Sequence, residues 1–284
     1  MATLFNLDAK VEHKTGAERP RVGKFRKPNP PTFDSDDERA RYQKGRLAMA
    51  ARIFDDQGWG IGCAGGLSAR DAINPDLIWV LPRRKPLCSI VSADLVGINL
   101  QGRIVVPSET LREYDEYVFL HLTIYRGRQD VNGIVSGHTP HGRTFSARGE
   151  TIRMLWQDSC FFSERVPVLP FMIGLNAAKD PEGVINILGD GKGFIMQNRG
   201  LLMTAATIEG AIATYIRLEN LCGNQLLVEA AIKGRGGKMI EVGEEEVKVE
   251  FTGMQNVGSE HHAWMMGMPY FARWDKRTGG ALVL

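Results

Sequence analysis

The sequence predicts an α/β protein in which helices cover a mixed β-sheet. Short apolar runs bounded by Gly, Pro and polar residues alternate with longer amphipathic segments, which is the pattern of strands alternating with helices. The chain has 284 residues, of which 43% are hydrophobic and 24% are charged, so it can bury one large core or two small ones. The sequence contains no internal repeat.

The composition excludes several classes of protein. The net charge of +2 does not indicate a nucleic-acid partner. No run of about 18 apolar residues predicts a membrane span, and the N-terminus lacks the pattern of a secretory signal. The four cysteines are scattered without a C-x-x-C pair, which indicates reduced thiols and a cytoplasmic protein. Residues 1–34 predict a flexible basic arm, either simply solvated or able to bind a polyanion.

The first half of the chain predicts two helices and several short strands. Ser35 and Glu38 match a capping box, so a helix is expected over 38–56, ended by Gly58. "LIWVL" predicts a buried strand, and "ADLVGINLQGRIV" predicts two strands joined by a turn at Gln101 and Gly102. A helix over 110–125 follows, and "VNGIVS" predicts a further strand.

The second half begins with a short helix, for which Thr139 suits the N-cap and Pro140 the first helical position. "DGKGFIMQNRGLLMT" predicts two strands joined by a tight turn at Arg199 and Gly200. The longest helix is expected to begin near Thr207. Its apolar stripe consists of Ile208, Ala211, Tyr215, Leu218, Cys222 and Leu226. The main domain is expected over 35–233, with 234–284 as an extension that packs on it or on a neighbouring subunit.

Four stretches together resemble the class II aldolase/adducin superfamily, most closely its fungal and other eukaryotic branch with an adducin-type domain. They are "GGLSARD", the helix with His121, "GIVSGHTPHGRTFSARG" and "QNRGLLMTAATIEGAIATYIRLENLCGNQLLVEAA". The resemblance implies a single-domain, three-layer α/β/α fold and a homotetramer with the active site at the subunit interface. Active members resemble fuculose-phosphate aldolase, in which three histidines hold a divalent ion and a Glu from the intervening helix transfers protons.

The residues at the implied metal site depart from that pattern. Ser136 takes the first position of the expected H-x-H, His138 takes the second, and Arg199 stands before Gly200 where the third histidine is expected. One imidazole does not make a zinc site, and a guanidinium repels a dication. We therefore expect no bound metal and no cofactor. An adventitious ion, or a site for Zn²⁺ or another divalent ion rebuilt from histidines at 121, 138 and 141, remains an alternative.

The resemblance places the proton-transferring Glu at Tyr117. Glu116 is one residue away, which is about 100° around a helix, so we expect it to point elsewhere. Tyr117 would either donate a proton or fill volume. His121, on the same predicted helix, would act itself, orient another group or serve as a buried core histidine.

The other candidate catalytic residues are His138, His141 and Arg199. Arg199 would hold a carboxylate, phosphate or enolate, or form a structural ion pair. The start of a helix disfavours imidazolium, so His138 and His141 would serve as bases, or would only hydrogen-bond their loop. The candidate substrate-binding residues, partly by resemblance, are Gly66, Ser68, Ser136 and Asp158, of which Asp158 would either border the pocket or hold its loop. His261, His262 and Trp264 would either close the site as a C-terminal lid or be exposed tail residues without a role.

Three functions compete. The first is a diverged lyase, isomerase or cyclase that acts without metal on an anionic or enolisable small molecule, for example in fungal secondary metabolism. The second is a metal-dependent aldolase with a rebuilt site, and the third is a non-catalytic, adducin-like assembly module. The residues that replace the expected ligands and Glu are polar (Ser136, Arg199 and Tyr117), which favours the first function. No lysine-rich, adducin-like tail is present, which counts against the third.

Overall fold

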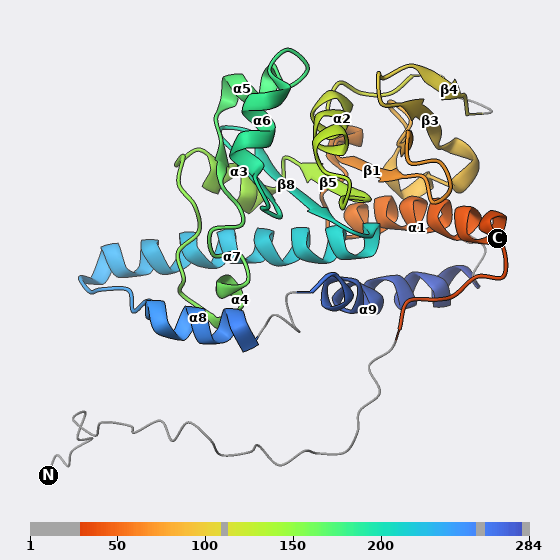
Figure 1. Cartoon of the computed structure of the whole chain (residues 1–284). Helices are drawn as coiled ribbons and strands as arrows, with labels where there is room; N and C mark the ends of the chain where they lie inside the picture. Colours follow the sequence, from red (N-terminus) through yellow and green to blue (C-terminus); the bar gives the residue numbers. More distant parts are fainter. Residues whose placement is uncertain (1–28, 109–112, 254–258, 280–284) are drawn as a thin grey trace, which may run out of the picture.

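The computed structural model describes residues 29–108, 113–253 and 259–279, and it places one β-sheet between two layers of helices (Figure 1). The strands of the described residues lie in the order β4-β3-β2-β1-β5-β8-β7-β6. Neighbouring strands are antiparallel except β6 and β7, which are parallel. The mixed sheet and the three-layer α/β/α class are therefore confirmed. The strands are β1 (Gly66–Arg70), β2 (Leu77–Val80), β3 (Val96–Asn99), β4 (Ile104–Val106), β5 (Gly133–Gly137), β6 (Val168–Leu169), β7 (Gly193–Met196) and β8 (Gly200–Ala205).

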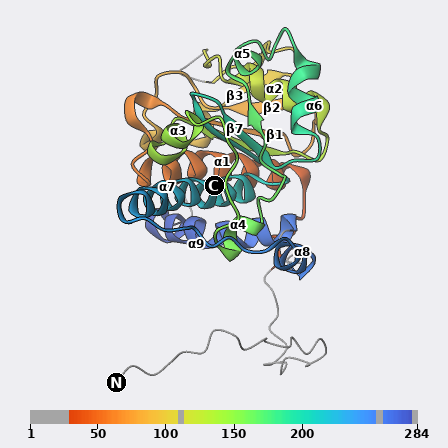
Figure 2. The same ribbon diagram turned by 90° about the vertical axis from the view of Figure 1, so that its left-hand side faces the viewer.

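The helices cover the two faces unequally. Figure 1 shows α2, α5 and α6 on one face, α1 and α7 on the other, and α9 on the far side of α1 and α7; Figure 2 confirms the place of α9 from the side. The α-helices are α1 (Asp36–Asp56), α2 (Val118–Gly127), α3 (Pro140–Ser146), α4 (Gln157–Cys160), α5 (Phe171–Leu175), α6 (Pro181–Leu188), α7 (Ile208–Arg235), α8 (Glu244–Gly253) and α9 (Glu260–Thr278). No helix of the described residues is long and apolar enough to span a membrane.

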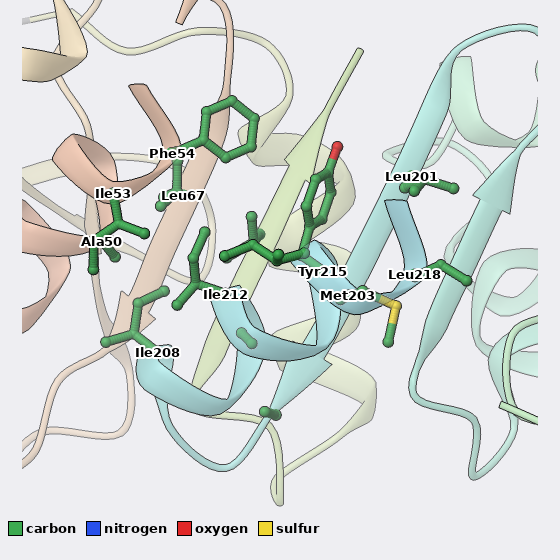
Figure 3. Packing of buried hydrophobic residues seen from close by; sticks show 14 of the residues in the cluster. Ala50, Ile53, Phe54, Leu67, Leu201, Met203, Ile208, Ile212, Tyr215 and Leu218 are labelled. Carbon is green, nitrogen blue, oxygen red and sulfur yellow. The ribbon is translucent and has the colours of Figure 1, made fainter. Parts of the chain in front are cut away.

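The larger core lies between the sheet and the helices α1 and α7. Figure 3 shows Ile208, Tyr215 and Leu218 of the predicted apolar stripe of α7, which pack with residues of α1 and of the inner strands. Tyr215 and Phe54 meet in this core with ring centroids 5.6 Å apart. A second core between the sheet and α2 and α6 includes the fully buried Tyr125. Because both faces of the central strands are covered, these strands are buried on both sides, including the polar residues Ser68, Arg70 and Ser136.

Helix α1 begins close to the predicted position. The Ser35 hydroxyl accepts a hydrogen bond of 3.2 Å from the backbone N–H of Glu38, which is half of a capping box. The Glu38 carboxylate accepts from the backbone N–H of Asp34, not from that of Ser35, so the reciprocal half is not formed. The backbone turns away at Gly58, where φ is +77°.

Helix α2 is shorter than the sequence predicts. Thr110 lies outside the described residues, and Tyr114 lies before the helix, which begins only at Val118. The hydroxyl of Tyr114 donates to the carbonyl of Gly102 in the β3–β4 turn, and Asp115 forms an ion pair of 3.0 Å with Arg83. These two contacts hold Tyr114 and Asp115 outside the helix, and Glu116 and Tyr117 form the turn that leads into it.

The C-terminal helix α9 packs on α1 and α7. Its Trp264 and Phe271 are buried. The fully buried guanidinium of Arg46 on α1 joins all three helices, because it lies 3.0 Å from Glu209 on α7 and 3.0 Å from Asp275 on α9. Residues 259–279 are therefore part of the folded body.

Candidate active site

The central strands bring the distant motifs to one end of the sheet. Strand β5 pairs antiparallel with both β1 and β8, with Gly66 opposite Ser136 and Gly137 opposite Leu201. The start of β1, the end of β5 and the start of β8 therefore meet. Gly66, His138 and Arg199, which are far apart in the sequence, lie together because of this register.

A cavity of about 320 Å³ opens at this end of the sheet. Its lining includes five predicted site residues, namely Gly66, Tyr117, Ser136, His138 and Arg199. The apolar part of the wall comes from the end of β7 and from α2 and α5, and includes Phe119, Leu120, Leu175 and Met196. The cavity is large enough for a small molecule with an apolar body and one anionic group.

Gly66 permits the close packing of the cavity floor. A Cβ atom on Gly66 would lie 2.4 Å from the Oγ of Ser136 and 2.7 Å from the Cδ2 of Tyr117. No side chain fits at those distances, so the absence of a Cβ lets the serine hydroxyl and the tyrosine ring approach the β1 backbone. The role of Gly66 here is steric.

The imidazole of His138 has a defined tautomer. Its Nδ1 lies 2.6 Å from the backbone carbonyl oxygen of Arg199. A carbonyl oxygen only accepts hydrogen bonds, so Nδ1 must carry the proton. In the neutral ring Nε2 is then the unprotonated nitrogen. His138 is exposed and lines the cavity, so this nitrogen is available as a base.

The Arg199 guanidinium is half-buried, and no carboxylate of the described residues forms an ion pair with it. Burial lowers the pKa of Arg199 from its ordinary value, but an arginine side chain stays charged at neutral pH. An unpaired cation in the wall of a cavity is an anion-binding group. The expected structural ion pair of Arg199 is not formed within the described residues.

A chain of hydrogen bonds runs beneath the cavity floor. The Nε2 of His121 lies 2.9 Å from the Oγ of Ser136, and its Nδ1 lies 2.8 Å from the Oγ of Ser68. The Oγ of Ser68 also lies 3.0 Å from the hydroxyl of Tyr125. Ser68 and Ser136 face the same helix because Gly66 pairs with Ser136 and side chains two positions apart in a strand share a face.

His121 does not act as a base in this position. Its ring is fully buried, and burial lowers the pKa of His121 to about 3. It does not line the cavity, and Ser68 is likewise fully buried beneath it. The expectation that His121 moves protons itself, and that Ser68 contacts the substrate, is therefore corrected: both support Ser136 from below.

Tyr117 occupies the cavity wall directly above His121. The two rings meet edge to face with centroids 5.0 Å apart. The Tyr117 hydroxyl donates a long hydrogen bond of 3.4 Å to the carbonyl of Leu67. Burial raises the pKa of Tyr117, and the carboxylate of Asp115 adds to the effect. Tyr117 therefore stays protonated at neutral pH and can donate a hydrogen bond, while burial disfavours the phenolate that proton transfer would leave.

Two predicted site residues do not reach this cavity. His141 lies on the side of α3 that faces α7, with its Nδ1 3.6 Å from the Oε1 of Glu219, because the chain turns into the helix at Pro140. Asp158 lies on α4 with a largely exposed side chain, 4.0 Å from Arg217. Neither side chain lines this cavity, so the structure favours for both the alternative of a role in their own loops.

The expected C-terminal lid is also absent from this cavity. Trp264 is buried in the wall of a second cavity of about 330 Å³ beside α1 and the start of α7. His261 and His262 lie on the same helix and do not line the first cavity.

Two carboxylates matter here, of which the sequence placed Glu116 away from the site and did not single out Glu219. Glu116 is exposed and lines the cavity, which corrects the expectation that it points elsewhere: the segment before Val118 is a turn and not a helix. Glu219 on α7 is buried and accepts hydrogen bonds from the hydroxyl of Thr139 and from the backbone N–H groups of His141 and Gly142. Glu219 therefore anchors the turn that follows His138.

The donor set does not fit a divalent ion. A zinc-type site needs at least three protein ligands, each with a free electron pair. Of the three residues at the implied positions, only His138 offers an imidazole nitrogen, its Nε2; Arg199 has no electron pair to offer, and Ser136 has only a neutral hydroxyl. In the parts of the chain that the structure describes, no three His, Cys, Asp or Glu side chains gather as metal ligands do. The alternative site built from three histidines is not formed in this structure. His121 is buried beneath Ser136, His141 faces Glu219, and neither lines the cavity with His138.

This fold and site define the class of protein. The chain belongs to the class II aldolase and adducin family: the profile described as "Class II Aldolase and Adducin N-terminal domain" matches residues 45–226.

Several individual relatives are similar over most of their length. The chain is 32% identical over 243 residues to Decarboxylase NovR of Streptomyces niveus, covering 84% of this chain and 86% of that protein. It is 33% identical over 206 residues to the 4-hydroxy-3-prenylphenylpyruvate oxygenase/4-hydroxy-3-prenylbenzoate synthase of Streptomyces roseochromogenus subsp. oscitans, covering 72% and 74% of the two chains. Among solved structures, L-fuculose 1-phosphate aldolase from Glaciozyma antarctica PI12 is similar with a TM-score of 0.78 and 30% identity, covering 89% of this chain and 96% of that one.

Proposed function

We propose that the protein is an enzyme that breaks or forms a C–C bond beside a carbonyl group of a small anionic substrate, without a resident metal ion. The observation that carries this proposal is the pair formed by Arg199 and His138 at one cavity. Arg199 supplies a cation with no counter-ion among the described residues, and His138 supplies an imidazole nitrogen, Nε2, to which none of those residues is hydrogen-bonded. Anion binding and proton transfer at one place are the elements of enolate chemistry.

The proposed cleavage balances without an oxidant or reductant. In an aldol-type cleavage, the Nε2 of His138 takes the proton of the substrate hydroxyl, the C–C bond breaks, and its electrons form an enolate held by Arg199. The imidazolium then returns that proton to the enolate carbon. In a decarboxylation the C–C bond releases CO₂, its electrons form the enolate, and protonated His138 gives its Nε2 proton to the same carbon. Read backwards, the aldol route forms a C–C bond.

The similarities support both routes. One relative is named a decarboxylase and one solved neighbour is named an aldolase. Decarboxylation beside a carbonyl and aldol cleavage share one difficult step, in which a C–C bond breaks and leaves its electrons as an enolate. A site that stabilises an enolate serves either reaction. Cyclisation or isomerisation of an enolisable compound, as in secondary metabolism, would use the same two residues.

We further propose that the chain forms a homotetramer in the cytoplasm. Phe119 and Leu175 in the cavity wall are 40% and 52% exposed, which is the surface expected where a second subunit borders the site. All four cysteines are free thiols, which suits a reducing compartment.

The proposal is tested by the fate of a proton. Purified protein is incubated in D₂O with a panel of 3-oxo acids and 3-hydroxy carbonyl compounds that carry a carboxylate or a phosphate. Mass spectrometry then follows CO₂, the carbonyl fragment, and deuterium at the carbon next to the carbonyl. We expect cleavage with deuterium in the product, lost in His138→Gln. Absence of both cleavage and deuterium exchange across the panel would favour a non-catalytic, adducin-like module.

A further inference from the structure

Ser136 is the only cavity-lining member of the buried hydrogen-bond chain among the described residues. Its hydroxyl lies between the Nε2 of His121, at 2.9 Å, and the carbonyl oxygen of Gly66, at 3.4 Å. The other members of the chain, Ser68 and Tyr125, are fully buried behind His121. The direction in which the protons of this chain point decides what Ser136 offers to a ligand.

The phenol of Tyr125 fixes that direction. Within the described part of the chain, the Oγ of Ser68 is the only hydrogen-bond partner that the structure gives to the Tyr125 hydroxyl. If Ser68 donated to Tyr125, the phenolic proton would be buried with no acceptor, at the full desolvation cost of that group. Tyr125 therefore donates to Ser68. Among the described residues, the Nδ1 of His121 is the other partner that the structure gives to the Ser68 hydroxyl, so the single proton of Ser68 is satisfied only if it goes to that nitrogen.

The remaining polarity follows step by step. Since Nδ1 accepts, the neutral imidazole of His121 carries its single proton on Nε2. Burial lowers the pKa of His121 to about 3, so a second proton on the ring is excluded near neutral pH. The Nε2–H group then donates to the Oγ of Ser136, and the proton of Ser136 is left to point elsewhere. Its resting acceptor, the Gly66 carbonyl, is at the long limit of hydrogen bonding, so a substrate oxygen can take that proton at little cost.

We propose that Ser136 donates a hydrogen bond to the substrate oxygen on which negative charge develops, and that His121, Ser68 and Tyr125 are positioning residues that aim this hydroxyl. The inference rests on the proposed enolate chemistry and deepens it. Arg199 supplies the positive charge, and Ser136 supplies a neutral donor that is oriented before the substrate arrives. A donor held in advance stabilises the transition state because it does not have to reorganise during the reaction.

The polarity is tested without any substrate. The protein is labelled with ¹⁵N in histidine, and two-bond ¹⁵N–¹H correlation spectra are recorded between pH 5 and pH 8. We expect one histidine that does not titrate in this range and that shows the Nε2–H tautomer. Its signals should shift in Ser68→Ala and in Ser136→Ala, which assigns them to His121. An Nδ1–H tautomer at that ring would reverse the chain and overturn the inference.

The donor role is tested by kinetics on a substrate found with the panel above. Ser136→Ala should lower kcat between about 100-fold and about 1,000-fold with little change in KM, as the loss of one oxyanion donor does. Tyr125→Phe, which leaves the cavity and its charges unchanged, should lower kcat about tenfold, in the range of losses seen when an orienting partner is removed. Tyr42→Phe is the matched control, because it removes a partly buried phenol that binds Glu209 on the opposite side of the sheet.

The outcomes separate this inference from the function on which it rests. Wild-type kcat in Ser136→Ala, in a protein that does turn over, would overturn the donor role and leave the proposed function standing. A wild-type protein with no turnover on the panel would remove the donor role together with the function, while the tautomer of His121 would still decide the polarity. Circular dichroism and the elution volume of each variant establish that it is folded.

Discussion

Replacing Arg199 with Ala removes the cation of the cavity and leaves the geometry of His138 unchanged. The hydrogen bond that orients His138 goes to the backbone carbonyl of residue 199. Any side chain at this position retains that carbonyl as long as the turn does not move. The turn itself depends on its neighbours, Asn198 with φ of 58° and Gly200 with φ of 149°. The variant therefore tests the guanidinium alone.

The size of the effect follows from Coulomb's law. A unit charge about 4 Å from a developing anion contributes about 4 kcal/mol at an effective dielectric constant of about 20. Arg199 is half-buried, and solvent screening reduces this to between about 2 and 4 kcal/mol. At about 1.4 kcal/mol per factor of ten, kcat/KM should fall between about 30-fold and about 1,000-fold.

Steady-state kinetics on the identified substrate, with the oligomer checked by light scattering, is the assay. Arg277→Ala is the control, because it removes an exposed arginine that binds Asp56 and does not line the cavity. Since the guanidinium of Arg199 is partly buried without an ion-pair partner, its removal should not lower the free energy of unfolding, and it should raise it by about 1 kcal/mol. A variant with wild-type kcat/KM would remove Arg199 from the mechanism. A variant that unfolds more easily would show that Arg199 is structural.

Three further predictions concern the same end of the sheet. Gly66→Ala should push the Ser136 hydroxyl and the Tyr117 ring out of place, lowering kcat at least tenfold and the free energy of unfolding by about 1–3 kcal/mol; unchanged activity would show that the cavity floor yields. The double variant Ser136→His with Arg199→His should take up one zinc ion per chain, measured by elemental analysis, because it restores the three-histidine set; no uptake would mean that the positions were matched wrongly. Because burial holds the pKa of His121 at about 3, below its ordinary value of about 6.5, the unfolded chain binds the extra proton first as the pH falls. The contribution of His121 to the free energy of unfolding is thus fully present above pH about 6.5 and declines by about 1.4 kcal/mol per pH unit toward pH 3. Denaturant titration between pH 5 and pH 6.5 should therefore find a smaller pH dependence of this free energy in His121→Gln than in the wild type. An equal pH dependence in the variant would show that another group causes it.

The fold was predictable because its elements are marked by short-range patterns. The apolar stripe of α7, the capping serine of α1 and the apolar runs of the inner strands depend on neighbours a few residues away. The junction after β5 was also readable, since Pro140 is the first residue of α3. The turn between β7 and β8 was placed close to its true position, at residues 197–199.

The site was less predictable because it depends on contacts across the sheet. Glu116 was missed because the helix was extended back to residue 110, whereas Tyr114 is tied to the carbonyl of Gly102. Asp115 and Glu116 stand just before the apolar run that begins at Val118. Because acidic residues mark the start of a helix, this pair indicated that the helix begins near Val118 and not at residue 110. The link from Ser68 to His121 requires the register of β1 against β5, which the sequence alone does not give.

Two errors concern the turn between β5 and α3. His141 was paired with His138 because they are three residues apart, but that spacing places side chains together only within one helix, and His138 lies before the helix begins. Glu219 was overlooked although it is an acid within the buried stripe of α7. A buried carboxylate needs several donors, and its partners are the hydroxyl of Thr139 and the backbone N–H groups at the start of α3.

We propose that Arg199 stabilises the enolate and His138 transfers the proton, so that the reaction proceeds without a metal site. The most direct test is to measure metal content and turnover on one sample of purified wild-type protein, before and after exhaustive treatment with a chelator. We expect far less than one divalent ion per chain and the same rate of C–C bond cleavage before and after treatment. One tightly held ion per chain, with turnover lost on its removal and restored by adding it back, would show that the reaction depends on a metal.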